Sequence, residues 1–151
     1  MTYGSPFEPI ETGEGAILSN FPFKNCPIQA TLGVLGKKWT LLILHDIGLL
    51  KISRFNQILA TLPGLAPKVL ATRLKELERE GFIERLESTR NPIVVRWGVT
   101  EKGKDTLPIL MRYVAFGSRW YADAVFPDKA PRTLSELFST PEAKKIVEGY
   151  V

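Results

Sequence analysis

The chain has 151 residues, of which 44% are hydrophobic and 24% charged, and its formal net charge is +4. This composition is typical of an ordinary globular protein, and the length is sufficient for one domain with a buried core. No apolar run approaches the roughly 20 residues that span a bilayer, and a chain with one Cys and one His has neither an internal disulfide nor a metal site built from a Cys/His cluster.

The positive charge is concentrated in the middle of the chain. Residues 26–122 hold 15 Lys and Arg against 8 Asp and Glu, whereas residues 1–25 and 123–151 are slightly acidic. A basic segment favours an anionic partner, although an ordinary solvated surface can give the same bias. The first residues lack the basic and apolar regions of a secretory signal, and a lone Cys is typical of a reducing compartment, so we expect a cytoplasmic protein.

The first half of the chain predicts an arm followed by two helices. Residues 1–25 are rich in Gly and Pro without periodicity, which is typical of an extended arm. Pro27 suits the first turn of a helix that Gly36 would end. Residues 39–50 predict a second helix, on which we expect His45 to be solvent-facing or internally satisfied. Its predicted buried face consists of Trp39, Leu42, Ile43 and Ile47.

Two further helices separated by a tight turn are predicted next. Ser53 is the candidate N-cap of a helix over residues 54–62, and Pro63-Gly64 forms the turn. The following helix begins at Pro67 and is closed by Gly81. Its core stripe is Leu70, Leu74 and Leu77. At 100° per residue the opposite face carries Lys68, Thr72 and Lys75, with Arg73 on the flank.

The second half predicts a β-hairpin and then more helix. Residues 82–86 and 94–99 have the composition of strands, and Arg90 lies in the turn-forming loop between them. Thr100 is the candidate cap of one long helix over roughly 101–124. Shorter helical segments are predicted to follow Thr133 and Thr140.

The order of these elements predicts a mainly α fold with a small β-hairpin wing, that is, an α+β winged helix-turn-helix domain with dimerisation helices. We expect an N-terminal arm over 1–25, this domain over 26–124 and a helical extension over 125–151. A helix-turn-helix places its second helix in the DNA major groove. The predicted DNA-binding residues are Lys68, Thr72, Arg73 and Lys75 on that helix, and Arg90 and Arg96 on the wing.

The chain resembles the HxlR-type family of winged helix-turn-helix transcriptional regulators, relatives of the MarR type, over about Cys26 to Trp120. The resemblance is carried by several short motifs spread over that range. They are Cys26-Pro27, Gly36-Lys37-Lys38-Trp39-Thr40-Leu41-Leu42-Ile43-Leu44, Arg54-Phe55-Asn56, Leu62-Pro63-Gly64-Leu65, Lys68-Val69-Leu70, Arg73-Leu74-Lys75-Glu76-Leu77-Glu78, Gly81 and Val99-Thr100-Glu101-Lys102-Gly103.

The resemblance implies a homodimer whose subunits meet through the first and last helices, and double-stranded DNA with an inverted-repeat operator as the partner. The wing departs from the family pattern, because Val94 replaces the usual Arg and Arg96 stands where an acid is common. Some members sense oxidants or electrophiles through a cysteine at the position of Cys26. Here Cys26 precedes the predicted first helix, whose positive end and Lys24 favour a thiolate, although a free Cys is often only a small buried hydrophobe.

Three functional classes remain to be compared. The leading one is a sequence-specific transcriptional regulator that requires no cofactor, with a redox or electrophile response through Cys26 as an added hypothesis and any small-molecule effector unidentified. The alternative is a winged-helix protein-interaction module without DNA binding, which acids on the recognition face would favour. An enzyme is disfavoured, since a Cys26–His45 pair has no apparent third orienting group, and we expect no catalytic or metal-binding residues.

Overall fold

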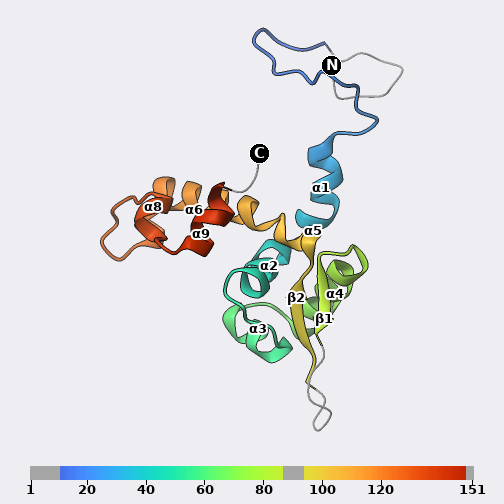
Figure 1. Ribbon diagram of the computed structural model, residues 1–151, viewed down its shortest axis with the longest axis vertical. Coiled ribbons are helices and arrows are strands. Elements are labelled where there is room, and N and C mark those ends of the chain that lie inside the picture. The colour runs from blue at the N-terminus through green and yellow to red at the C-terminus, as the bar shows by residue number, and fades with distance from the viewer. Residues whose placement is uncertain (1–10, 87–93, 149–151) are drawn as a thin grey trace. The chain divides into compact units, whose positions relative to one another are not determined.

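The computed structural model describes residues 11–86 and 94–148, and the chain divides into two compact units between Thr40 and Leu41. In the first unit, residues 11–25 form neither helix nor strand, and helix α1 spans Pro27–Leu35 (Figure 1). Cys26 is its N-cap and Pro27 lies in its first turn. Gly36 ends the helix, and its N–H donates to the Leu32 carbonyl. These boundaries agree with the prediction.

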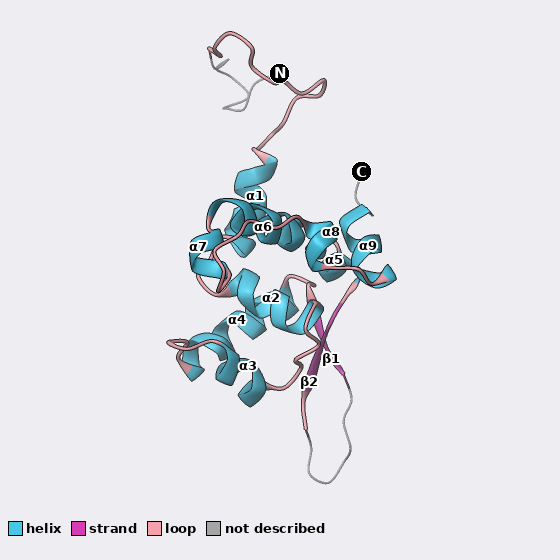
Figure 2. Cartoon of the chain, turned by 90° about the vertical axis from the view of Figure 1, so that its left-hand side faces the viewer, coloured by secondary structure: helices cyan, strands magenta, loops and turns pink. Residues whose placement is uncertain are grey.

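The second unit contains the remaining helices and one antiparallel hairpin. The elements are α2 (Thr40–Gly48, which begins at the boundary residue), α3 (Phe55–Thr61), α4 (Pro67–Arg79), β1 (Ile83–Leu86), β2 (Arg96–Val99), α5 (Glu101–Lys104), α6 (Leu107–Trp120), α7 (Ala122–Val125), α8 (Leu134–Leu137) and α9 (Pro141–Glu148). In the hairpin, Ile83 pairs with Val99 and Leu86 with Arg96. This mainly helical arrangement with a two-stranded wing confirms the predicted fold class (Figure 2).

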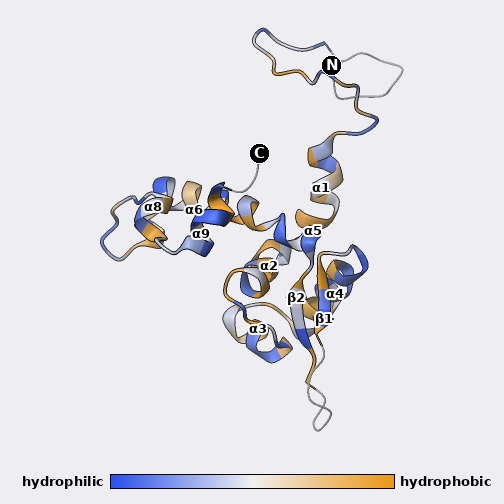
Figure 3. Cartoon of the chain, in the orientation of Figure 1, coloured by the Kyte–Doolittle hydropathy of each residue, from blue (hydrophilic) through white to orange (hydrophobic). Residues whose placement is uncertain are grey.

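Apolar and polar residues alternate along the helices of the second unit (Figure 3), and its core is formed mainly by buried apolar residues of α2, α3, α4, α6 and the two strands. The predicted stripe of α4 is confirmed, because Leu70, Leu74 and Leu77 are all buried. Other elements bury Ile43, Leu44, Ile47, Ile58, Ile83, Trp97, Leu107, Leu110 and Met111. Since burial of a large aliphatic side chain contributes about 1.5–3 kcal/mol, this shared core fixes α4 against its neighbours.

The predicted buried face of α2 is partly wrong. Trp39 lies before the helix, with a left-handed φ of +79°, and Leu42 is half exposed. Ile43 and Ile47 are buried as predicted, but Leu44 is buried in place of Leu42. Four consecutive apolar residues, 41–44, cover every direction around a helix, so their periodicity does not identify the buried face.

The predicted long helix over 101–124 is also wrong, because it is divided into α5, α6 and α7. Pro108 occupies the first turn of α6. A proline in a helix interior lacks the N–H for a bond to the carbonyl four residues earlier and its ring crowds that carbonyl, here that of Lys104. A new helix therefore begins at Leu107, while Thr100 caps α5 as predicted by accepting from the Gly103 N–H.

The last described residues form α8 and α9, and both contact α6 (Figure 1). Thr133 and Thr140 accept hydrogen bonds from the N–H groups of Glu136 and Ala143, as the predicted helix starts require.

In the loop before α8, the Arg132 guanidinium binds the Asp128 carboxylate in a bidentate manner and lowers the pKa of that carboxyl to about 2. No described helix is long and apolar enough to cross a membrane.

Candidate nucleic-acid interface

The turn between α3 and α4 sets the direction of the candidate recognition helix. Leu62 and Leu65 are buried and anchor the two ends of the turn, and the Leu65 N–H donates to the Leu62 carbonyl. Gly64 has a φ of +89°, a conformation that side chains other than glycine rarely adopt. The chain can therefore reverse within a few residues, so that α4 packs against α3.

The exposed face of α4 carries the side chains that the sequence predicts for DNA binding. Lys68, Thr72 and Lys75 are exposed, on the side opposite the buried leucines. The Thr72 hydroxyl donates to the Lys68 carbonyl at 3.0 Å, and neither Lys68 nor Lys75 forms an ion pair within the described residues. Ala66, the N-cap, supplies no side-chain hydrogen bond to the first turn. The first amides of α4 and both ammonium groups are thus suited to phosphate oxygens.

Arg73 lies on the flank of α4, as predicted, but it has an acidic partner. Its Nη1 is 3.5 Å from Oε2 of Glu76, one turn further along the helix, and both side chains are mostly buried. This pair directs the guanidinium along the helix flank. Arg73 therefore differs from Lys68 and Lys75, whose ends extend into solvent.

The wing has two exposed basic residues among the described positions, Arg96 and Arg85. Arg96 begins β2 and is exposed, opposite Leu86 of β1. The next residue, Trp97, is buried, and its N–H donates to the Ser53 carbonyl at 2.9 Å. This bond ties the wing to the loop before α3. Arg90, the other predicted wing residue, lies outside the described residues.

Arg85 is a structural residue that the sequence argument did not single out. Its Nε donates to Oε2 of Glu78 at 3.1 Å, and its guanidinium lies 5.1 Å from the centre of the Trp97 ring. It thereby joins the end of α4 to both strands of the wing. These contacts span three elements, and no local spacing in the sequence indicates them.

The remaining predicted residues, Cys26 and His45, lie elsewhere. Cys26 is half-buried at the start of α1 and its side chain makes no capping hydrogen bond. The His45 Nδ1 is 3.6 Å from Oδ1 of Asp46, a carboxylate that is itself buried and accepts a hydrogen bond from Thr61. At 3.6 Å this contact is too long for a hydrogen bond, and the His45 side chain is 36% exposed, so of the two expected states the structure shows the partly solvent-facing one. No cluster of three potential metal ligands occurs in the described residues.

Comparisons with known proteins agree with this geometry. The model of the HxlR-like helix-turn-helix family matches residues 34–125, more than half of the chain. The chain belongs to this family. The uncharacterized HTH-type transcriptional regulator YdzF of Bacillus subtilis is 30% identical over 94 residues, which are 62% of this chain and 86% of the relative.

Two solved regulators share the fold. The reduced form of YodB from B. subtilis is 34% identical with a TM-score of 0.53, covering 63% of this chain and 93% of that protein. The redox regulator HypR in its oxidised form is 32% identical with a TM-score of 0.54, covering 61% and 94%. As an HxlR-like protein the chain is a winged helix-turn-helix regulator, and the matches indicate no enzyme family. The predicted division at residues 25 and 124 stays a prediction.

Proposed function

We propose that the protein is a sequence-specific DNA-binding transcriptional regulator that acts as a homodimer on an inverted-repeat operator. The observation that carries this proposal is the exposed face of α4, where Lys68, Thr72 and Lys75 lie opposite the buried leucine stripe of the same helix. Arg73 on the flank and Arg96 on the wing supply further positive charge. In a helix-turn-helix, a basic helix that is packed against the preceding helix enters the major groove, and a basic wing can contact the DNA beside it.

The test is an electrophoretic shift with the DNA upstream of the protein's own gene. We expect a saturable complex that unrelated duplex DNA displaces only poorly, because specific sites typically bind 10³–10⁷ times more tightly than non-specific ones. Binding no tighter than to unrelated DNA at moderate salt would favour the alternative of a protein-interaction module.

The homodimer is supported by an exposed apolar stripe on α6. Ile109, Tyr113, Phe116 and Trp120 recur at intervals of four, three and four residues, and all are exposed, with Trp120 64% exposed. A heptad-like stripe of this kind is the seam by which helices pair. In the first unit, α1 likewise exposes Ile28 and Leu32, one turn apart. Both helices therefore have unburied apolar surface.

Replacing Phe116 and Trp120 by Ser is expected to weaken dimerisation by at least tenfold, because two large aromatic side chains would lose their burial between subunits. Sedimentation equilibrium over a micromolar concentration range measures the change. Leu50→Ser with Leu86→Ser, a double variant of exposed apolar residues outside α1 and α6, is the control. A wild-type protein that remains monomeric throughout this range would contradict the homodimer.

A redox response is the remaining part of the proposal. Cys26 is the N-cap of α1, and its side chain makes no capping hydrogen bond. The similar protein HypR is named a redox regulator. With a single cysteine per chain, oxidation by diamide would join the Cys26 thiols of two subunits in one disulfide, while the diamide is reduced to the hydrazine.

Diamide is therefore expected to change the DNA affinity of the wild type but not of Cys26→Ser. A non-reducing gel should show a covalent dimer in the wild type alone. Serine keeps the size of the side chain, so its own DNA affinity should match that of the reduced wild type. An equal response of the two proteins, or no response in either, would leave Cys26 as a packing residue.

A further inference from the structure

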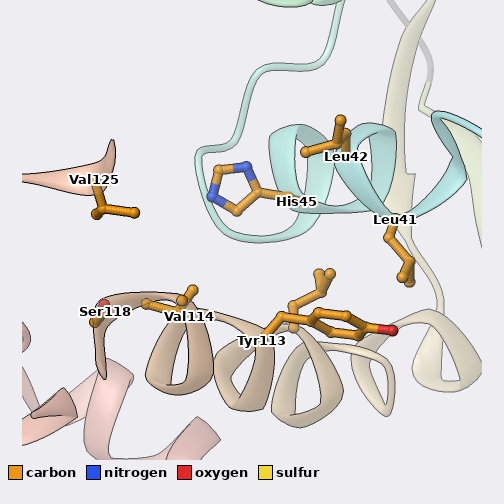
Figure 4. Close-up of a pocket in the computed structure, with 9 residues that line it drawn as sticks. Leu41, Leu42, His45, Tyr113, Val114, Ser118 and Val125 are labelled. Carbon is orange, nitrogen blue, oxygen red and sulfur yellow. The ribbon is translucent and has the colours of Figure 1, made fainter. Parts of the chain in front are cut away.

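Helices α2, α6 and α7 of the second unit line an open apolar cavity of about 480 Å³, and none of its lining residues belongs to α4 or the wing (Figure 4). Helix α2 contributes Leu41, Leu42 and His45, and α6 contributes Leu110, Val114 and Gly117. A cavity of about 150 Å³ lined by apolar side chains already holds a benzene molecule. The volume here is within the range of small-molecule sites, and it has room for a molecule of two fused rings.

His45 is the polar group that α2 presents to the cavity, and it is backed by a buried acid. Figure 4 shows the His45 ring extending from α2 toward Val125. Its Nδ1 faces the Asp46 carboxylate at 3.6 Å, and Asp46 is only 2% exposed. The separation is too long for a hydrogen bond, but a neutral imidazole that carries its proton on Nδ1, the side of the carboxylate, has its other nitrogen free to accept one. The cavity therefore offers an acceptor within apolar walls.

The charge of the lining restricts the ligand further. Of the described residues that line the cavity, none is Lys, Arg, Asp or Glu. An anionic ligand would lose its hydration without gaining a cationic partner, and the buried Asp46 would repel it. A neutral ring system that carries one hydroxyl donor satisfies both the apolar walls and His45. The Tyr113 ring also lines the cavity and supplies an aromatic contact.

We propose that this cavity binds a neutral aromatic alcohol of the naphthol class, with its hydroxyl donating to His45, and that the bound ligand alters the helix-turn-helix through Asp46 and Thr61. Thr61 is the last residue of α3, immediately before the turn that leads into α4. Its hydroxyl lies within hydrogen-bond distance of both the Asp46 carboxylate and the Ile58 carbonyl. A hydroxyl has one proton to share between these acceptors, so a shift of Asp46 changes the bonding at the end of α3.

The binding site stands on its own, whereas its effect on transcription rests on the DNA-binding function proposed above. The first experiment therefore omits DNA. Titration of the full chain with 2-naphthol by calorimetry is expected to show one saturable site per chain. The charged analogue 2-naphthoate and unsubstituted naphthalene should each bind at least tenfold more weakly, the first because of its charge and the second because it lacks the hydroxyl.

Gly117→Leu tests the location of the site. No atom lies within 4 Å of a Cβ placed on Gly117, so a leucine side chain can occupy the cavity without displacing its walls. Leucine also favours the helix more than glycine does, so the variant should fold. We expect at least a tenfold loss of 2-naphthol affinity, with unchanged affinity in Ala130→Leu, which places the same side chain in an exposed loop.

His45→Phe tests the proposed hydrogen bond while keeping an aromatic ring. It should bind 2-naphthol and naphthalene about equally, because the preference for the hydroxyl is lost. No binding of 2-naphthol to the wild type, equal binding to Gly117→Leu, or tight binding of 2-naphthoate would overturn the proposed site. Coverage of the cavity by a second copy of the chain would give the first of these results.

Thr61→Val tests the connection to the helix-turn-helix. This variant should bind 2-naphthol like the wild type, but the ligand should no longer change its affinity for DNA, whereas Thr61→Ser should keep the response. A coupling between two sites typically corresponds to a change of 5- to 150-fold, so the wild-type response should be at least fivefold. An unchanged response in Thr61→Val would refute the connection, and absence of DNA binding with normal naphthol binding would refute only the proposed function.

Discussion

Replacing both Lys68 and Lys75 by Ala is expected to lower the affinity for operator DNA by about a hundredfold. Each exposed lysine would lose a charge-assisted contact with DNA, and such contacts contribute about 1.5–3 kcal/mol when fully formed. If both contacts are to phosphates, the slope of log affinity against log salt should decrease by about 0.9 for each lysine. A contact to a base would instead relax specificity at one position of the operator.

The matched control for this variant is Lys144→Ala with Lys145→Ala. These lysines are exposed on α9, and their removal lowers the net charge by the same amount. Gel shifts at several salt concentrations between 50 and 200 mM should therefore show little change in the DNA affinity of the control. Over this range the loss of a phosphate contact changes the salt dependence of the affinity measurably. If Lys68, Arg73 and Lys75 can all become Ala without loss of affinity, α4 is not the helix that reads DNA.

The exposed face of α4 was predictable because three independent signals coincide there. Pro67 marks the start, the leucines at positions 70, 74 and 77 mark the buried face, and Gly81 with its φ of +80° marks the end. Once the buried face is known, helical geometry places Lys68, Thr72 and Lys75 opposite it. Even the Arg73–Glu76 pair is a local contact, since the two residues are three apart on one helix.

Other features could be found only in three dimensions. Residues 41–44 are all apolar, so the buried face of α2 depends on which helices pack against it. Pro108 itself is a local signal for the break between α5 and α6, but the apolar pattern of residues 107–120 led to the prediction of one continuous helix. The contacts of Arg85 with Glu78 and Trp97, and of Asp46 with Thr61, join separate elements. Sequence spacing does not determine such contacts, because they depend on how the elements pack.

The glycine of the Val99–Gly103 motif is expected to be the most sensitive position in the fold. A Cβ on Gly103 would lie 2.0 Å from the Phe82 carbonyl oxygen, a backbone atom that also accepts a hydrogen bond from the Thr100 N–H. The approach is close because α5 is held against the end of α4. The Thr100 hydroxyl donates to the Gly81 carbonyl, and the Lys102 ammonium donates to the Glu80 carbonyl at 2.6 Å.

Gly103→Ala should therefore reduce the free energy of unfolding by about 1–3 kcal/mol, because overpacking against a backbone atom cannot be relieved by a change of rotamer. Gly117→Ala is the matched control: it lies in α6 with no atom within 4 Å of the added Cβ, and alanine should stabilise that helix by up to about 1 kcal/mol. Urea unfolding followed by circular dichroism measures both. Helix propensity alone would make both variants more stable, so opposite signs identify the contact with Phe82 as the cause. A Gly103→Ala protein as stable as the wild type would show that α5 does not approach the Phe82 carbonyl this closely.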